Sequence, residues 1–263
     1  MVKVVIFTNC QGRAIYENWL RPVLTSVGSS GELHVTTVDA GSDSHQELLA
    51  ALSAGCDIFI YQPVSGITAV TDGSGPFALL SPTCKRICFP SIYYDGWPLY
   101  FEKGLVVGGG VIQEYRELGR TLDELLDAFE RGALCFRLAD RVRASTAYMR
   151  ERERAFCNIV VSDFIDAHAR RFRLFDTQNH PNGIILCHVA KQICAQLGLQ
   201  LTVDEFTQGH IHLGTPIVCW PWSDYIQLEL GLEYGRGEIP CGKMDYSRVI
   251  AAVYNKTALI KYK

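Results

Sequence analysis

Residues 2–12 read VKVVIFTNCQG, and this stretch decides the fold of the chain. Val2–Phe7 is a run of apolar and β-branched residues that is typical of a strand. The run stops at Thr8, and an amphipathic stretch from Arg13 to Ser26 predicts a helix. Cys10 is therefore expected in the turn between a strand and the helix that follows it.

The alternation of strand and helix continues along the first third of the chain. Further strands are expected at Leu33–Val38, Asp57–Tyr61 and Arg86–Phe89, and a helix is expected at His45–Ala54. Strands that alternate with helices in this way form a parallel sheet. We therefore predict an α/β fold in which a parallel sheet is flanked by helices, as a Rossmann-like three-layer core.

The middle of the chain changes to a helical pattern. Thr121 and Glu124 fit a capping box that opens a helix through Phe129. We expect a single α/β domain spanning residues 1–263, with a helical insertion at roughly residues 110–171. A helix is expected over residues 136–156, with an apolar face formed by Phe136, Ala139, Val142, Met149 and Phe156. The other expected segments are loops at 62–83 and 90–110, helices at 158–169, 184–197, 223–232 and 246–254, and strands at 172–175 and 217–220.

The composition limits the classes to which the protein can belong. Of the 263 residues 48% are hydrophobic and 20% charged, and the net charge of −3 argues against a dedicated nucleic-acid binder. No apolar run approaches the roughly 20 residues that span a bilayer, and the N-terminus lacks the pattern of a signal peptide. We expect a cytoplasmic protein whose ten cysteines are reduced thiols. The spacing of these cysteines contains no CxxC pair, so no metal is expected. The sequence leaves the oligomeric state open.

Cys10 is the first candidate for chemistry. A residue that follows a parallel strand lies at the carboxyl edge of the sheet, where ligands of open α/β folds bind. The N-terminus of the next helix favours an anion, such as a thiolate, an oxyanion or a phosphate. Because the thiolate is the nucleophilic form of cysteine, this position suits nucleophilic catalysis. The alternative is that Cys10 is a small apolar residue that fills a tight turn.

A nucleophilic cysteine needs a base, and His180 is the histidine best placed to supply one. It lies between an expected strand and an expected helix, with Asp176 four residues earlier and Asn179 beside it. That turn can occupy the same sheet edge as Cys10, and Asp176 would fix the tautomer of the imidazole. Pro181 fits the first turn of the next helix. The alternative is that Asn179 or Asp176 merely caps that helix and that His180 is a solvated turn residue.

Further candidates follow the other strands. The backbone N–H groups of Cys10, Gln11 and Gly12 are candidate donors to an oxyanion. The side-chain amide of Gln62, which follows the third strand, is another. Ser91 follows the fourth strand in the same way. The aromatic residues Tyr93, Tyr94 and Trp97 could wall a pocket for a sugar or an acyl group. The alternatives are that Gln62 simply starts a loop and that the aromatic loop covers a core.

Arginines are concentrated in the middle of the chain. Between Arg131 and Arg173 there are ten arginines, no lysine and five acidic residues, so this block is locally basic. Arg137 and Arg141 are one helical turn apart and are expected to share a helix face. Such a face suits the phosphates of a cofactor, and Arg13 is a further candidate. The alternative is a solvated helix face.

Four segments, in this order, resemble the capsular polysaccharide biosynthesis family typified by WcbI: TNCQG at 8–12, YQP at 61–63, FPSIYYDGWP at 89–98 and DTQNHPNG at 176–183. The motif of that family reads G-N-C-Q, and Thr8 replaces its glycine here. The resemblance implies binding of coenzyme A or acetyl-CoA and acetylation of sugars in surface polysaccharides. It also implies a distant relation to SGNH-type esterases, whose late D-x-x-H turn is one residue shorter than the spacing of Asp176 and His180.

The resulting hypothesis is an acyltransferase of capsular or surface polysaccharide biosynthesis that acetylates a sugar hydroxyl from acetyl-CoA with a Cys–His site. The alternatives are an SGNH-like esterase and a non-catalytic protein that binds a glycan or a nucleotide sugar. The implied partners are a coenzyme A thioester and a sugar or polysaccharide precursor, without metal, nucleic acid or a membrane span. The expected catalytic residues are Cys10, His180 and Asp176, and the expected binding residues are Asn9, Gln11, Arg13, Gln62, Ser91, Tyr94, Arg137, Arg141, Asn179 and Asn182.

Overall fold

The chain divides into two compact units. The computed structural model describes residues 1–28, 33–40, 44–63, 75–96, 100–102, 105–107, 110–213, 224–234 and 246–256. Unit 1 comprises Met1–Ile92, Met149–Phe164 and Asn182–Leu213; unit 2 comprises Tyr93–Tyr148, Ile165–Pro181 and Gly214–Lys263. The expected helical insertion at 110–171 thus contributes to both units. The single domain stays a prediction, because compactness alone does not say whether either unit folds independently.

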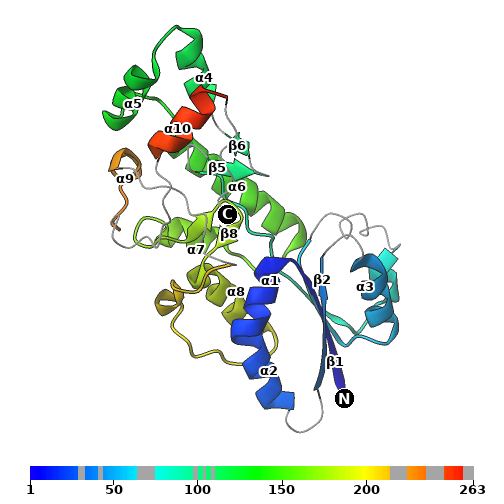
Figure 1. Ribbon diagram of the computed structural model, residues 1–263. Coiled ribbons are helices and arrows are strands. Elements are labelled where there is room, and N and C mark those ends of the chain that lie inside the picture. Colours follow the sequence, from blue (N-terminus) through cyan, green and yellow to red (C-terminus); the bar gives the residue numbers. More distant parts are fainter. Residues whose placement is uncertain are drawn as a thin grey trace. The chain divides into compact units, whose positions relative to one another are not determined.

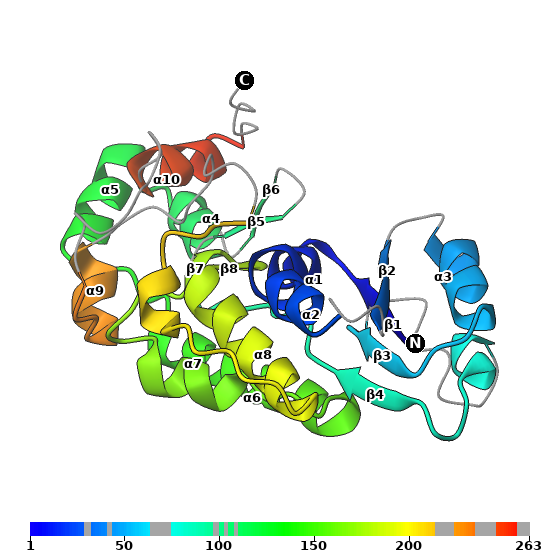
Figure 2. The same cartoon turned by 90° about the horizontal axis from the view of Figure 1, so that it is seen from below.

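Unit 1 is built on a parallel sheet, as predicted. Its strands are β1 (Val2–Thr8), β2 (Leu33–Asp39), β3 (Ile58–Tyr61) and β4 (Lys85–Cys88), in the order β2-β1-β3-β4. All three pairings are parallel. The carboxyl ends of β1, β3 and β4 therefore meet at one edge, and the segments that follow these strands start there. Figure 1 labels β1 and β2 of this sheet, and Figure 2 labels all four strands.

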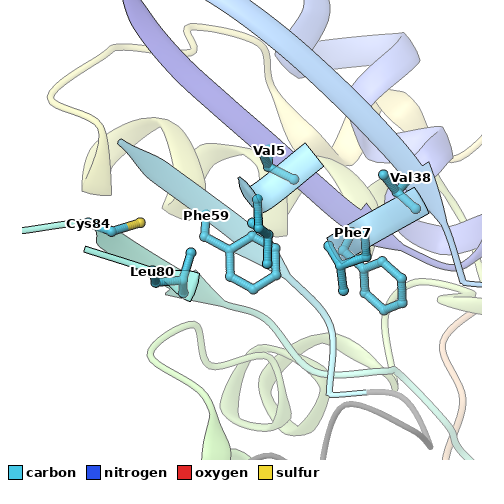
Figure 3. Close-up of a cluster of buried hydrophobic side chains, with 8 residues drawn as sticks. Val5, Phe7, Val38, Phe59, Leu80 and Cys84 are labelled. Carbon is cyan, nitrogen blue, oxygen red and sulfur yellow. The ribbon is translucent and has the colours of Figure 1, made fainter. Parts of the chain in front are cut away.

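Helices cover both faces of this sheet. Helix α3 (Ser44–Ser53) packs on one face, and α1 (Cys10–Ile15), α2 (Arg21–Gly28) and α8 (Gly183–Gln196) lie on the other (Figure 2). The pleat divides the side chains of β1 between these layers. On the α3 side, side chains of the sheet form a buried cluster with α3 and with the segment before β4 (Figure 3). Its members are Val5, Phe7, Val38, Leu48, Leu52, Phe59, Leu80 and Cys84.

The first helix departs from the expected Arg13–Ser26. It begins at Cys10, because the Asn9 side chain caps it and so supports an earlier start. A π-helical turn, Tyr16–Leu20, joins α1 to α2, which ends at Gly28. Cys10 is consequently the first helical residue rather than part of a longer turn.

The two long loops contain regular structure that the sequence pattern did not predict. A 3-10 helix, Gly75–Leu79, lies in the first of them. In the second, β5 (Tyr100–Glu102) and β6 (Leu105–Val107) pair as an antiparallel hairpin. Strands of three residues are too short to establish the alternation that identifies a strand in a sequence. The expectation of an irregular stretch over 90–110 was therefore wrong at these residues.

Most of the remaining helices match their predictions. Thr121 forms the predicted capping box with Glu124 and opens α5 (Leu122–Glu130). Gly198 follows α8 with the positive φ of +74° that suits a C-terminal glycine. The other helices are α4 (Gly110–Glu117), α6 (Leu138–Phe156), α7 (Ser162–His168), α9 (Asp224–Leu230) and α10 (Tyr246–Tyr254). The strand expected at 217–220 and Trp97 lie outside the described residues.

The expected apolar face of α6 is confirmed only in part: Phe136, which precedes the helix, and Met149 are buried, with 5% and 2% of their surfaces exposed. Ala139 is exposed and Phe156 keeps 45% of its surface exposed, whereas the polar Ser145 and Glu153 are buried. Burial of these polar groups is tolerated because each has hydrogen-bond partners. The Ser145 hydroxyl accepts from the backbone N–H of Asp95, and the Glu153 carboxylate accepts from backbone N–H groups at the start of α7. Among the described residues, no helix is long and apolar enough to cross a membrane.

Candidate active site

The turn after β1 presents a cysteine at the start of a helix. The Asn9 side chain accepts a hydrogen bond from the Gln11 N–H at 2.9 Å and so caps α1. Cys10, the first residue of α1, is an exposed free cysteine. Its neighbours Thr8 and Gln11 are buried, with 3% and 2% of their surfaces exposed. The turn is thus anchored on both sides of an accessible thiol.

Gly12 permits the close approach of α1 to the end of β1. A Cβ atom at Gly12 would lie 2.2 Å from the Cβ and 2.4 Å from the Cγ2 of Thr8. Carbon atoms do not approach so closely without displacement of the chain. The helix can therefore start directly after the strand only while residue 12 has no side chain.

A buried amide network fixes this turn to the segments after β3 and β4. Gln62, which is fully buried, accepts from the backbone N–H of Asn9 at 3.0 Å. Its Nε2 donates to the Gln11 Oε1 and to the Pro90 carbonyl, each at 3.2 Å. Gln11 in turn donates to the Ile92 carbonyl at 2.7 Å and accepts from the Ile92 N–H at 2.9 Å. One pair of glutamines therefore joins three strand ends.

This network bears on the roles expected for Gln11 and Gln62. Both N–H hydrogens of the Gln62 amide point to protein acceptors, which leaves none for a substrate oxyanion. Both side chains are buried and bonded to backbone N–H and carbonyl groups. Without these amides, those backbone groups would be left unpaired in the interior. These bonds position the Cys10 turn, and a direct role of Gln11 or Gln62 in substrate binding stays a prediction.

Gln62→Glu is expected to destabilise the protein, because a carboxylate oxygen would face two acceptors where the amide now donates. The expected loss in the free energy of unfolding is about 1–3 kcal/mol for each hydrogen bond lost. The loss should be larger at pH 8 than at pH 5, where a protonated carboxyl can again donate. Urea denaturation measures this loss in the free energy of unfolding.

Gln192→Glu is the matched control. Gln192 also bonds a backbone N–H and a backbone carbonyl, both of Val160, but its side chain is half-exposed. Equal losses in both variants would contradict the prediction.

Ser91 and an unexpected arginine lie beside the cap. The Asn9 Nδ2 donates to the Ser91 hydroxyl at 3.4 Å, so the structure places Ser91 next to the turn. The Arg152 guanidinium, from α6, donates to the Ser91 carbonyl at 3.4 Å. Arg152 was one of ten arginines in a basic block, and nothing in the local pattern distinguished it from the others.

His180 lies in unit 2, in a short hairpin formed by β7 (Phe175–Thr177) and β8 (His180–Pro181). Its Nδ1 is 3.0 Å from the Thr177 hydroxyl, which donates to the Asn179 side-chain oxygen at 3.1 Å. A hydroxyl has one hydrogen, so the Thr177 oxygen accepts from the imidazole Nδ1–H. The Nε2 of neutral His180 then carries the lone pair, as a general base requires.

The surroundings of His180 differ from the expected acid–histidine pair. Thr177, which sequence analysis missed, provides the contact at Nδ1 that was expected from Asp176. The Asp176 carboxylate is 3.4 Å from the guanidinium of Arg173, and its charge raises the pKa of His180. Burial of the imidazole is the larger effect, and it lowers the pKa of His180 below the ordinary value.

The prediction that Pro181 occupies the first turn of the next helix was wrong. Pro181 is in β8, and Asn182 caps α8 by accepting from the Ile184 N–H at 3.1 Å. Asn182 is 3% exposed, and its side chain has the capping role that the alternative interpretation gave to Asn179 or Asp176. Asn179 is exposed and instead accepts from Thr177.

The arginines expected to hold phosphates are engaged in other contacts. Arg137 precedes α6 with a φ of 54°, so it does not share a helix face with Arg141 as expected. It pairs with Asp140, and Arg141 donates to the carbonyl of Asp95. In unit 1, Arg13 pairs with Asp39 at the end of β2, although its side chain stays 62% exposed.

Unit 2 contains a largely apolar cavity of about 290 Å³. Tyr94 contributes to its wall and stacks on Phe175, with ring centroids 4.8 Å apart. Burial raises the pKa of the Tyr94 hydroxyl, which therefore stays neutral. The apolar part of the lining comes from Ala139, Val142, Ile165, Ala169, Leu174, Leu230, Leu232 and Tyr234. In the part of the chain that the structure describes, no three His, Cys, Asp or Glu side chains are grouped to hold a metal ion.

The structure thus joins the candidates into two groups. Asn9, Cys10, Gln11, Gln62 and Ser91 lie together in unit 1. His180 and Asp176 belong to unit 2, so their pairing with Cys10 stays a prediction.

Comparison with known proteins relates the chain to one family. The family model described as "Polysaccharide biosynthesis enzyme WcbI" matches residues 3–202. A solved structure with the same fold is superposed with a TM-score of 0.60 at 19% identity, over 82% of this chain and 74% of the other. It is described as WcbI, a polysaccharide biosynthesis enzyme, in its native form without a disulfide bond between coenzyme A and one of its cysteines. No curated protein matches the sequence.

Proposed function

The chain belongs to the WcbI family of polysaccharide biosynthesis enzymes, and from this premise we propose that it transfers an acetyl or similar acyl group from a coenzyme A thioester to a sugar hydroxyl. The observation that carries the proposal is the exposed thiol of Cys10 at the start of α1, on the carboxyl edge of the sheet. The related WcbI structure is described with reference to a bond between coenzyme A and a cysteine, which supports coenzyme A as the donor.

The proposed reaction has two steps at Cys10. The base takes the proton of Cys10, and the thiolate attacks the thioester carbonyl. The carbon–sulfur bond to coenzyme A breaks, and the sulfur of coenzyme A leaves with the proton that the base held, which gives an acyl-cysteine. The sugar hydroxyl then attacks that carbonyl, its proton passes to the base, and the Cys10 thiolate is released. The Gln11 N–H is bonded to Asn9, so the N–H groups of Cys10 and Gly12 are the proposed donors to the oxyanion.

His180 is proposed as the base. Its Nδ1 contact with Thr177 leaves Nε2 as the basic nitrogen. Along the chain, only Pro181 separates His180 from Asn182, the cap of α8, and α8 packs against α1, which begins with Cys10. This connection supports the pairing of the two residues. Asp176 would act through its charge, and Thr177 would orient the ring.

We propose two cations of unit 1 for the phosphates of coenzyme A: Arg13, which lies in α1 with Cys10, and Arg152, which donates to the Ser91 carbonyl beside the turn. The cavity of unit 2 has a largely apolar wall that suits an acyl chain or the apolar face of a sugar ring, and Arg143 and Arg170 also line it. Arg152→Met is expected to weaken coenzyme A binding in a thermal-shift titration. The exposed Arg154, in the same helix, gives the matched control Arg154→Met. Equal affinity in both variants would remove Arg152 from the proposal.

Incubation with acetyl-CoA and a panel of sugars, followed by mass spectrometry, tests the proposed reaction. Acetylated sugar together with free coenzyme A is the expected result. Free acetate without acetylated sugar would instead indicate an esterase that uses water. Absence of both products with sugars that bind tightly would favour a non-catalytic glycan- or nucleotide-sugar-binding protein.

The pH dependence of transfer tests His180. A general base must be unprotonated. We therefore expect kcat/KM to be maximal above the ordinary imidazole pKa of 6.5 and to fall only as the pH drops through the lowered pKa of His180. Asp176→Asn removes the charge that raises this pKa, so the acid limb should move to still lower pH. Asp163→Asn, at an exposed aspartate that pairs with Arg150, is the control. An acid limb that stays in place in Asp176→Asn would contradict the proposed coupling.

A further inference from the structure

Unit 1 contains two pairs of thiols that the proposed reaction does not use. The sulfurs of Cys56 and Cys84 are 3.9 Å apart, and those of Cys88 and Cys157 are 3.5 Å apart. All four are free cysteines. The pairs lie at opposite ends of β4, since Cys84 precedes this strand and Cys88 is its last residue. Two close thiols become a disulfide when they are oxidised, so each pair is a candidate for modification.

The backbone around Cys157 is fixed to Cys88. The N–H groups of Asn158 and Ile159 both donate to the Cys88 carbonyl at 3.1 Å. The Asn158 side chain accepts from the Cys88 N–H at 2.7 Å and donates to the Arg86 carbonyl at 3.0 Å. These bonds hold the two cysteines side by side. Little conformational entropy is therefore lost when their sulfurs form a disulfide.

The two pairs differ in reactivity. Burial raises the pKa of Cys56 to about 12 and also raises that of Cys84, so both stay protonated. The pKa of Cys88 is lowered, chiefly by the hydrogen bond between its sulfur and that of Cys157 and further by one with Tyr61, while burial acts in the opposite direction. The thiolate is the form that reacts with peroxides. Of these four thiols Cys88 is therefore the one that favours the thiolate; it is buried, and its half-exposed partner Cys157 gives a peroxide access to the pair.

We propose that Cys88 and Cys157 form a redox-modification site, at which a peroxide converts the two thiols into a reversible disulfide. The Cys88 thiolate attacks one peroxide oxygen, the O–O bond breaks, and the hydroxide that leaves takes up the proton lost by Cys88. The Cys157 sulfur then attacks the sulfenic acid of Cys88, the S–O bond breaks, and water leaves with the Cys157 proton. Overall, two thiols and one hydrogen peroxide give one disulfide and two waters.

The site lies next to the segment that holds the Cys10 turn. Cys88 is followed directly by Phe89–Ile92, whose Pro90 carbonyl bonds Gln62 and whose Ile92 backbone bonds Gln11. A disulfide would tie the end of α6 covalently to the base of this segment. The modification does not depend on the proposed acyl transfer, and its test requires no substrate.

Peptide mapping after treatment with hydrogen peroxide tests the proposal. The protein is then denatured, alkylated with iodoacetamide and digested with trypsin without reduction. Trypsin separates Cys88 (residues 87–103) from Cys157 (155–170) but leaves Cys56 and Cys84 within one peptide, 14–85. The expected product is the linked pair 87–103 and 155–170, two hydrogen masses lighter than the separate peptides, and dithiothreitol should release it.

Variants make the result specific. Cys157→Ser should abolish the linked pair and expose the Cys88 sulfenic acid to dimedone, whereas Cys56→Ser should leave the linkage unchanged. Cys157→Ala provides a second way to remove the partner thiol. If Cys88 and Cys157 are both fully alkylated after peroxide treatment, or if the Cys56–Cys84 peptide oxidises at lower peroxide, the proposal is overturned.

Discussion

Replacement of Cys10 by serine should nearly abolish acyl transfer while the protein keeps its stability. The thiol is the proposed nucleophile, and a hydroxyl at the same place is a far weaker one. His180→Ala should reduce the rate by roughly two to four orders of magnitude, the usual contribution of a general base. Because Cys10 is exposed, its replacement removes little packing, and the free energy of unfolding should change by less than about 0.5 kcal/mol.

A second exposed cysteine provides the control for this experiment. Cys135 is also free and exposed but lies in unit 2, away from the turn after β1 in sequence. Cys135→Ser should therefore keep full activity. Intact-mass spectrometry with acetyl-CoA should detect an acyl adduct on the wild type and on Cys135→Ser, but not on Cys10→Ser. Near-normal turnover in both Cys10→Ser and His180→Ala would reject the proposed site.

Gly12→Ala should give the largest loss of stability among single substitutions in this turn. The new Cβ would lie 2.2 Å from the Cβ of Thr8, and both the strand end and the helix start are fixed by the buried amide network. Overpacking of this kind costs about 3 kcal/mol when the neighbours cannot move. Urea denaturation measures the loss, and the displaced helix start should also slow alkylation or acylation of Cys10.

A second-site change distinguishes this clash from a general effect of alanine. Thr8→Gly removes the side chain that the new methyl group meets, so the double variant Gly12→Ala, Thr8→Gly should be more stable than the sum of the two single effects predicts. Gly110→Ala is the matched control, because Gly110 also begins a helix and a Cβ added there would meet no atom within 4 Å. Strict additivity in the double variant would contradict the steric explanation.

The regular parts of the fold were predictable because their signals are local. The apolar run Val2–Phe7 and the capping box at Thr121 each act on neighbouring residues, and the structure confirms the elements that they define. The parallel sheet followed from the alternation of these elements. Where the signal was too short, as in the three-residue strands β5 and β6, the prediction failed.

The sequence by itself determined a parallel sheet whose first strand is followed by a cysteine at the carboxyl edge, whereas the start of the helix at Cys10 itself was not predicted. Tertiary structure alone decided what surrounds this cysteine. Gln62 bonds Asn9 across 53 residues, and Gln11 bonds Ile92 across 81, so no local pattern could show that these amides serve the backbone. No local pattern could show the contact of Arg152 with Ser91, which is 61 residues away, or that of Cys88 with Cys157, which is 69 residues away. Hydrophobic periodicity specifies which face of an element is buried, whereas the partner of each polar group is set only when distant segments pack together.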